Sequence, residues 1–159
     1  NSLILPPDYL QALEEHVLLG FTGQTRDATH MAGAQIEKIQ RGNSCMSEIH
    51  SIAQEALQLF EAKADLPRIG KLLDASWRIK RSITTGISND QIDDLYEAGL
   101  NAGAYGGKLL GAGGGGFIMF LAPPCNHKRI KDALPGVKVW VPFKMDQSGA
   151  HVIMHTVAY

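Results

Sequence analysis

The sequence predicts an α+β fold, in which an antiparallel sheet carries helices packed on one face. Five short apolar segments have the length and residue types of strands, and they lie at 2–5, 16–22, 116–122, 137–143 and 150–157. Segments with helical spacing of apolar residues lie between these strands. The last two strands are separated by a short turn, which is typical of antiparallel pairing. Together these observations favour helices and strands packed in layers around one core.

The first elements are short. Two prolines end the first strand, and residues 8–15 follow as a short helix that begins at an aspartate near its N-cap. The strand at 16–22 comes next and is followed by a glycine. From 25 to 41, apolar residues at helical spacing precede Gly42, which predicts one amphipathic helix in this segment.

The middle of the chain has the clearest helical pattern. From 47 to 63, apolar residues follow the i, i+3, i+4, i+7 spacing of one helix face, and they are Ile49, Ile52, Ala53, Ala56, Leu57 and Phe60. The same period continues from 66 to 80, so we expect the two helices to pair as an αα-hairpin. A further helix is predicted to begin after Ser88 or Asn89 and to end near Gly103.

The last third alternates between strand, helix and turn. A short helix at 128–134 is closed by a Pro-Gly pair, and the strand at 137–143 shows alternation of period two. The residues 146–149 are typical of a turn, and the strand at 150–157 follows them. These segments predict a β-hairpin at the C-terminal end of the chain.

Composition narrows the function classes. With 159 residues, 45% hydrophobic and 19% charged residues and a net charge of −1, the chain reads as one ordinary globular domain without the basic footprint of a nucleic-acid-binding protein. No apolar run is long enough for a membrane span and no secretory leader pattern opens the chain, so we expect a cytoplasmic protein. Cys45 and Cys125 lack the spacing of a zinc site or a disulfide framework, and we predict no metal site.

The glycine loop, residues 111–116, is the feature with the most functional content. Six of the eight residues from Gly111 to Ile118 are glycine or alanine, and residues of this kind let several backbone N–H groups approach one ligand. Gly111, Gly113 and Gly116 fit a dinucleotide fingerprint, but here the glycines precede a strand, whereas the fingerprint follows one. A glycine-rich turn that only allows close packing and a loop that binds a ligand both remain open.

The context of this loop resembles a known family. The segment Gly106-Gly-Lys-Leu-Leu-Gly-Ala-Gly-Gly-Gly-Gly-Phe117 is similar to the third, C-terminal motif of the GHMP kinases. The segments Phe21-Thr-Gly-Gln-Thr-Arg26, Ser76-Trp-Arg-Ile-Lys80 and Thr85-Gly-Ile-Ser-Asn89 resemble the D-glycero-D-manno-heptose 7-phosphate kinase branch, whose members are often called galactokinase-like. The resemblance covers about residues 1–157 and implies a ferredoxin-like antiparallel sheet.

The resemblance also implies that two domains share the catalytic function. The family's phosphate-binding loop, Pro-x₃-Gly-Leu-Ser-Ser-Ser, does not occur in these 159 residues. Residues 1–159 are therefore expected to form the C-terminal domain of an ATP-dependent sugar or sugar-phosphate kinase, and to be inactive alone. ATP and Mg²⁺ would be bound mainly by an N-terminal domain of the same polypeptide. The catalytic base and the magnesium ligands would lie outside this chain.

By the same resemblance, the glycine loop closes one wall of the cleft between the two domains. The residues implied to bind substrate or phosphate are Lys108, Gly111, Ala112, Gly113, Gly114, Gly115 and Gly116. A sugar phosphate needs cations, and the sequence offers Arg26, Lys80 and Arg81 for this contact. Each of these three could instead be an exposed charge at a helix end.

Two other interpretations stay open. The chain could be a stand-alone ligand-binding or regulatory module of ferredoxin-like fold, without catalysis, or a structural domain that dimerises through its sheet. The expected partners are an N-terminal domain of the same polypeptide and a sugar or sugar phosphate, and a homodimer is compatible with these. We expect neither nucleic acid nor membrane as a partner.

Overall fold

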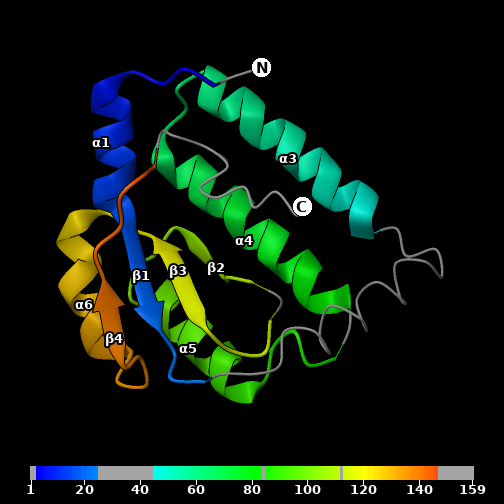
Figure 1. Ribbon diagram of the computed structural model, residues 1–159, viewed down its shortest axis with the longest axis vertical. Coiled ribbons are helices and arrows are strands. Elements are labelled where there is room, and N and C mark those ends of the chain that lie inside the picture. The colour runs from blue at the N-terminus through cyan, green and yellow to red at the C-terminus, as the bar shows by residue number, and fades with distance from the viewer. Residues whose placement is uncertain (1–2, 25–44, 84, 112, 147–159) are drawn as a thin grey trace, which may run out of the picture.

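The computed structural model describes residues 3–24, 45–83, 85–111 and 113–146. Their elements, in chain order, are α1 (Pro7–His16), β1 (Val17–Phe21), α3 (Cys45–Glu61), α4 (Leu66–Ile83), α5 (Asp90–Asn101), β2 (Gly106–Leu109), β3 (Phe117–Leu121), η1 (Pro124–Asn126), α6 (His127–Ala133) and β4 (Val139–Val141). The four strands form one antiparallel sheet in the order β2-β3-β1-β4. Figure 1 shows the sheet with the long helices α3 and α4 beside it.

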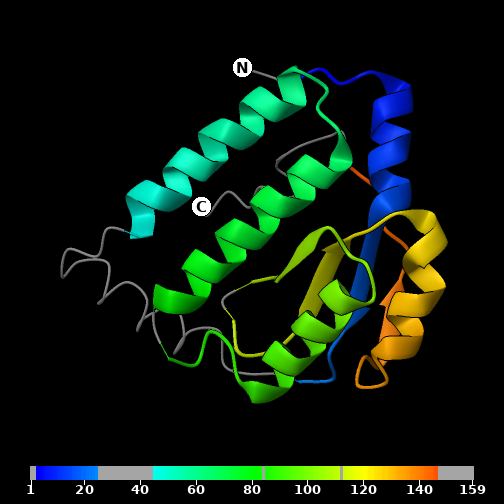
Figure 2. The same ribbon diagram turned by 180° about the vertical axis from the view of Figure 1, so that it is seen from behind.

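One face of the sheet is closed by helices. In the register, Phe120 lies opposite both Leu18 and Gly107, and Ile118 lies opposite Leu109. Successive side chains of a strand point to opposite faces, so these residues share one face, which we call the closed face. Viewed from behind, α5 and α6 lie over this face (Figure 2). Their buried residues complete its core, and they are Ile92, Tyr96 and Ile130.

Helix α4 approaches the edge of the sheet very closely. A Cβ atom placed on Gly106 of β2 would lie 1.8 Å from the carbonyl oxygen of Gly70 in α4, so glycine is required at this contact. Trp77 of α4 is fully buried and its ring centroid lies 6.2 Å from that of Tyr96. Helix α3 runs beside α4 (Figure 1). The predicted αα-hairpin is therefore present, and α4 joins it to the sheet.

The opposite face, which we call the open face, is covered less completely. Its core contains Leu121 of β3 together with residues from α1, α3 and α4. Toward the other end of this face, Phe117, Val139 and Val141 are 38%, 54% and 38% exposed. The two faces of one small sheet therefore differ in how completely the described chain buries them.

Most of the predicted elements are confirmed, and the α+β class with an antiparallel sheet is confirmed. The strand at 2–5 is wrong: residues 3–5 pair with no strand of the described chain, and Ile4 is 89% exposed. The apolar residues there have the composition of a strand. The two prolines that follow begin α1 directly, so the segment leads into a helix instead. The strand at 137–143 is shorter than predicted, since β4 spans Val139–Val141.

Strand β2 was not among the predicted strands. Its Gly-Gly-Lys-Leu sequence has low β-propensity, and pairing with β3 overrides that preference. The helix predicted at 25–41, the strand at 150–157 and most of the turn at 146–149 lie outside the described residues. In the described part of the chain, no helix has the length and hydropathy needed to cross a membrane.

Candidate functional site

The glycine loop lies between two other loops that are distant in the sequence. The N–H of Gly114 donates to the carbonyl of Ile87 at 2.9 Å, and the N–H of Gly116 donates to the carbonyl of Gln24 at 2.8 Å. The hydroxyl of Thr22, which is buried, donates to the carbonyl of Gly116 at 2.9 Å. Three segments that the sequence singled out separately, at 21–26, 85–89 and 111–116, therefore meet at one end of the sheet.

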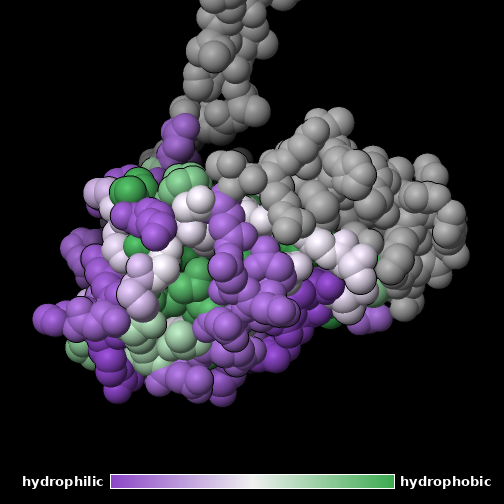
Figure 3. Space-filling view, turned by 90° about the horizontal axis from the view of Figure 1, so that it is seen from below, coloured by the Kyte–Doolittle hydropathy of each residue, from purple (hydrophilic) through white to green (hydrophobic). Residues whose placement is uncertain are grey.

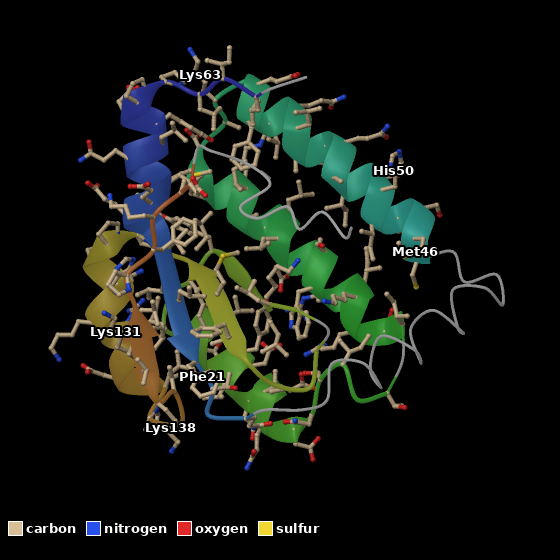
Figure 4. All side chains as sticks on the ribbon, viewed as in Figure 1. Phe21, Met46, His50, Lys63, Lys131 and Lys138 are labelled. Carbon is tan, nitrogen blue, oxygen red and sulfur yellow. The ribbon has the colours of Figure 1, made fainter. Side chains whose placement is uncertain are left out.

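Polar side chains hold the two flanking loops together. Asn89 caps α5, since its Oδ1 accepts from the N–H of Ile92 at 3.0 Å. The Nδ2 of Asn89 donates to Oε1 of Gln24 at 3.0 Å, and Nε2 of Gln24 donates to Oε1 of Gln91 at 2.7 Å. Gln24 thus links its own loop both to the N-cap of α5 and to the first turn of that helix. Figure 4 labels Phe21 at the end of β1, where this loop begins.

The glycines of the loop serve two different purposes. A Cβ on Gly113 would lie 2.8 Å from the backbone of Ile87, and one on Gly115 would lie 2.7 Å from the carbonyl oxygen of Gln24. These two positions need glycine for packing. At Gly111 and Gly116, φ is +76° and +96°, yet no atom of the described residues, apart from the two chain neighbours, lies within 4 Å of an added Cβ. Close packing therefore explains the glycines at 113 and 115, but it does not explain those at 111 and 116.

The backbone donors divide in the same way. We predicted that the N–H groups of Gly113 to Gly116 are available to a ligand, but those of Gly114 and Gly116 already bond to Ile87 and Gln24. Among the described residues, the N–H groups of Gly113 and Gly115 have no acceptor. Two of the four predicted donors therefore remain for a ligand. The predicted number of available donors was too high, because the sequence does not show that Ile87 and Gln24 accept hydrogen bonds from this loop.

One lysine contacts the glycine loop, and a second lysine lies near the first. Lys80, in the last turn of α4, donates from Nζ to the carbonyl of Gly111 at 2.5 Å. Burial lowers the pKa of Lys80, and the nearby charge of Lys108, on β2, lowers that pKa further. Within the ranges that the structure describes, neither lysine forms an ion pair with a carboxylate. The loop thus has two neighbouring cations that no described acidic group neutralises.

Arg81 has a different environment from Lys80. Its Nη1 lies 2.8 Å from Oδ1 of Asp93, which also accepts from the hydroxyl of Ser88 at 2.6 Å. This pair ties the end of α4 to α5 and holds the loop that contains Ile87. Arg26 and Ala112 lie outside the described residues. Of the three predicted cations for a sugar phosphate, Lys80 is therefore the one that contacts the glycine loop in the described chain.

The described histidine on α3 lies apart from the loop. His50 is exposed on α3, where Figure 4 labels it. No group of three or more His, Cys, Asp or Glu side chains in the described residues could hold a metal ion. The end of the molecule seen in Figure 3 has a mainly hydrophilic surface around a hydrophobic patch. The described polar groups at the loop are thus backbone N–H groups and the ammonium group of Lys80.

Sequence reasoning missed three residues, of which two contribute to this site and one contributes to the neighbouring core. Thr22 and Gln24 fall within a segment chosen for its resemblance, but nothing local indicated that they bond to the glycine loop. The third is Tyr96, which is fully buried and donates to Oδ1 of Asp74 at 2.5 Å and to the carbonyl of Gly107 at 3.2 Å. The sequence did contain one signal for this hydrogen bond. Tyr96 lies on the apolar face of a predicted helix, and a buried tyrosine hydroxyl needs a hydrogen-bond partner.

Comparison with known proteins identifies relatives of this chain. The chain is 35% identical, over 124 residues, to a D-glycero-alpha-D-manno-heptose 7-phosphate kinase of Campylobacter jejuni, covering 77% of this chain and 36% of that protein. It is 32% identical to a bifunctional fucokinase/GDP-fucose pyrophosphorylase of Arabidopsis thaliana, covering 76% of this chain and 12% of that protein. The chain thus spans about a third of the first relative's length and a smaller share of the second's.

The fold is shared more widely. A crystal structure of L. major mevalonate kinase in complex with R-mevalonate superposes with a TM-score of 0.68 at 21% identity, covering 79% of this chain and 40% of that one. Residues 53–137, which include α4, α5, β2, β3 and the glycine loop, match the family described as GHMP kinases C terminal. The chain therefore belongs to the GHMP kinase C-terminal domain family.

Proposed function

We propose that residues 1–159 form the C-terminal, acceptor-side domain of an ATP-dependent sugar or sugar-phosphate kinase. The observation that carries this proposal is the contact of Lys80 with the glycine loop, with Lys108 near Lys80 and the N–H groups of Gly113 and Gly115 without a described acceptor. Charged donors and free backbone N–H groups bind phosphate oxygens strongly. The names of the relatives, a heptose phosphate kinase and a fucokinase, support this substrate class.

The reaction proposed for the whole protein is phosphoryl transfer to a sugar hydroxyl. The hydroxyl oxygen bonds to the terminal phosphorus of ATP, the O–H proton passes to a base, and the bond between that phosphorus and ADP breaks. Catalysis of this kind depends mainly on positioning and on charge stabilisation. We assign no base and no magnesium ligand to this chain. ATP and Mg²⁺ are proposed to bind mainly to an N-terminal domain of the same polypeptide.

The lysine pair favours an acceptor that already carries a phosphate. Two cations brought together in a partly buried place repel each other, and a dianion between them removes that repulsion. A neutral sugar hydroxyl offers no such compensation. In this arrangement Lys80 and Lys108 hold the acceptor's phosphate, and the free N–H groups of the loop orient the acceptor or the transferring group.

The interpretation as a ligand-binding module without catalysis makes a different prediction for the isolated chain. If the proposal is right, the pure chain shows no turnover with ATP, Mg²⁺ and a panel of sugars and sugar phosphates, whereas the whole protein does. Magnesium-dependent phosphorylation by the isolated chain contradicts the proposal that catalysis requires an N-terminal domain. A whole protein without kinase activity contradicts the proposed function.

The decisive test separates the two kinds of glycine. Gly111→Asn keeps the positive φ, which asparagine tolerates, and places its side chain in open space next to Lys80. In the whole enzyme we expect kcat/KM to fall about 10²-fold, since a small misplacement of reacting groups has that effect, while the melting temperature changes little. Gly113→Ala is the matched control, because its Cβ would meet the backbone of Ile87 and it should lower stability and activity together. If Gly111→Asn leaves activity unchanged, the loop serves packing alone.

A further inference from the structure

Gly116, the last residue of the glycine loop, is held on both sides by the segment that follows β1. Its carbonyl accepts from the N–H and from the hydroxyl of Thr22, each at 2.9 Å. Its N–H donates to the carbonyl of Gln24 at 2.8 Å. The N–H of Gln24 donates in turn to the hydroxyl of Thr22 at 3.3 Å. The buried hydroxyl of Thr22 thus bonds both to Gly116 and to the residue that accepts from Gly116.

These bonds depart from the regular pairing of the sheet. Phe21 and Phe117 form the last register pair of β1 and β3. In a regular antiparallel ladder, a hydrogen-bonded pair of residues exchanges both of its backbone bonds. Gly116 instead divides its bonds between Thr22 and Gln24, and Gly23 lies between these two at φ +78°. A regular ladder needs no side-chain hydroxyl at this point, whereas this arrangement uses one.

Two anchored peptide units of the loop flank the N–H of Gly115. A peptide unit is planar, so a hydrogen bond to its N–H restricts the orientation of the whole unit. Ile87 holds the unit that carries the N–H of Gly114, and Gln24 holds the unit that carries the N–H of Gly116. The N–H of Gly115 belongs to the unit between them and has no acceptor among the described residues. Its direction is thus set by the two anchors.

The side chain of Gln24 ties the two anchors to each other. Its Oε1 accepts from Nδ2 of Asn89 at 3.0 Å. Asn89 follows Ile87 by two residues and is itself fixed as the N-cap of α5. The loop that holds Gly114 and the loop that holds Gly116 are therefore kept at one separation.

We propose that Thr22 and Gln24 are positioning residues, which hold the glycine loop so that the N–H of Gly115 donates to an oxygen of a phosphate group. This rests on the proposed function, since the phosphate group belongs to the acceptor or is the group transferred. A donor that is already oriented needs no reorganisation when the anion binds, and such donors are the effective ones in binding and in transition-state stabilisation. Both residues act through Gly116.

Titration of the 159-residue chain with inorganic phosphate, followed by its amide resonances, tests this role without kinase activity. We expect phosphate to shift the N–H resonance of Gly115, and potassium chloride at equal ionic strength to leave it in place. Thr22→Val removes the hydroxyl and should weaken phosphate binding about tenfold, the effect of losing one hydrogen bond of ordinary strength. Thr22→Ser keeps the hydroxyl and should bind phosphate nearly as well as the unmodified chain.

Matched controls separate positioning from loss of stability. Tyr9→Phe also removes a hydroxyl that donates to a carbonyl, that of Ala64, but Tyr9 lies in α1, which precedes β1, whereas Thr22 follows β1. This variant should melt at a lower temperature and bind phosphate unchanged. Gln24→Met should weaken phosphate binding several-fold, whereas Gln11→Met, which removes a side-chain hydrogen bond on α1, should not.

The outcomes distinguish this role from the proposed function. The positioning role is wrong if phosphate does not shift Gly115, if Thr22→Ser loses as much affinity as Thr22→Val, or if Gln24→Met binds as tightly as the unmodified chain. In an active whole enzyme, kcat/KM should fall in Thr22→Val by the same factor as phosphate binding and be retained in Thr22→Ser; an unchanged kcat/KM in Thr22→Val also contradicts the role. A whole protein without kinase activity contradicts the proposed function alone, because the phosphate titration still decides the positioning.

Discussion

The two faces of the sheet are covered by different helices and to a different extent. On the closed face, Ile118 and Phe120 are fully buried under α5 and α6. In the chain, α5 comes directly before β2 and β3, and α6 comes shortly after them. On the open face, cover comes from α1 and from the hairpin α3–α4, and a groove of about 340 Å³ remains. The same strand, β3, contributes apolar side chains to both faces.

Within the described residues, the core is therefore complete on one side of the sheet and incomplete on the other. The helices and strands of the closed face, apart from β1 and β4, fall within residues 53–137, the stretch that matches the family. The groove is lined partly by residues from both ends of the chain, such as Leu13 and Met145. The helices that cover the closed face thus lie within the matched stretch, whereas the cover of the other face also includes α1 and residues after β4.

The largest effect is expected from truncation on the closed face. Phe120→Ala should lower the free energy of unfolding by about 3–5 kcal/mol, because a fully buried ring is removed and its surroundings relax only in part. Met119→Ala, the adjacent residue facing the groove, should cost much less, because the site is already open on one side. Urea unfolding of both variants measures the contrast. Equal losses for the two would contradict the distinction between the faces.

A smaller effect is expected where α4 meets β2. Gly106→Ala places a methyl group against the carbonyl of Gly70, so the helix must move away, and overpacking of this kind typically costs about 1–3 kcal/mol. Gly20→Ala meets only the side chains of Val137 and Trp140 and should be milder, since side chains can shift. Thermal melting of the two variants checks the order. The reverse order would indicate that α4 is not held rigidly against the sheet.

Removal of one hydroxyl tests the polar part of the closed face. Tyr96→Phe removes the donor that bonds to Asp74 and to the carbonyl of Gly107, and we expect a loss of about 1–2 kcal/mol. Burial, together with the hydrogen bond to Asp74, raises the pKa of Tyr96 well above its usual value, so the hydroxyl stays protonated throughout the accessible pH range. The loss should therefore be the same at pH 6 and pH 9, as measured by denaturant unfolding. A pH-dependent loss would contradict this account.

The smallest effect concerns the open face. The hydrogen bond from Lys144, followed by that from the N–H of Met145, lowers the pKa of Glu14. A lowered folded-state pKa means that the contact stabilises the chain above the usual glutamate value near 4.5 and is lost as the pH falls through the lower, folded value. The melting temperature of Glu14→Gln should thus lie slightly below that of the unmodified chain at pH 7 and equal it near pH 3. A difference that persists at pH 3 would contradict the assigned cause.

Local patterns were sufficient for the long helices. Periodic apolar residues predicted α3, α4 and α5 to within a few residues at each end. Of the two starts predicted for α5, after Ser88 or after Asn89, the structure shows the second. The strand at 2–5 failed because apolar composition alone does not supply a neighbouring strand. β2 was missed for the opposite reason: its glycines have weak propensity, and the partner strand and the close approach of α4 account for their presence.

The sequence by itself determined which residues form the glycine loop, which helices are amphipathic, and to which family the motif points, because these properties depend on residues close together in the chain. Only the tertiary structure decided that Gly114 and Gly116 bond to the loops at 85–89 and 21–26, that Lys80 rather than Arg81 reaches the glycine loop, and that one face of the sheet is closed and the other is not. Contacts of this kind join residues tens of positions apart. They depend on how packed elements fit together in space, which no local spacing encodes.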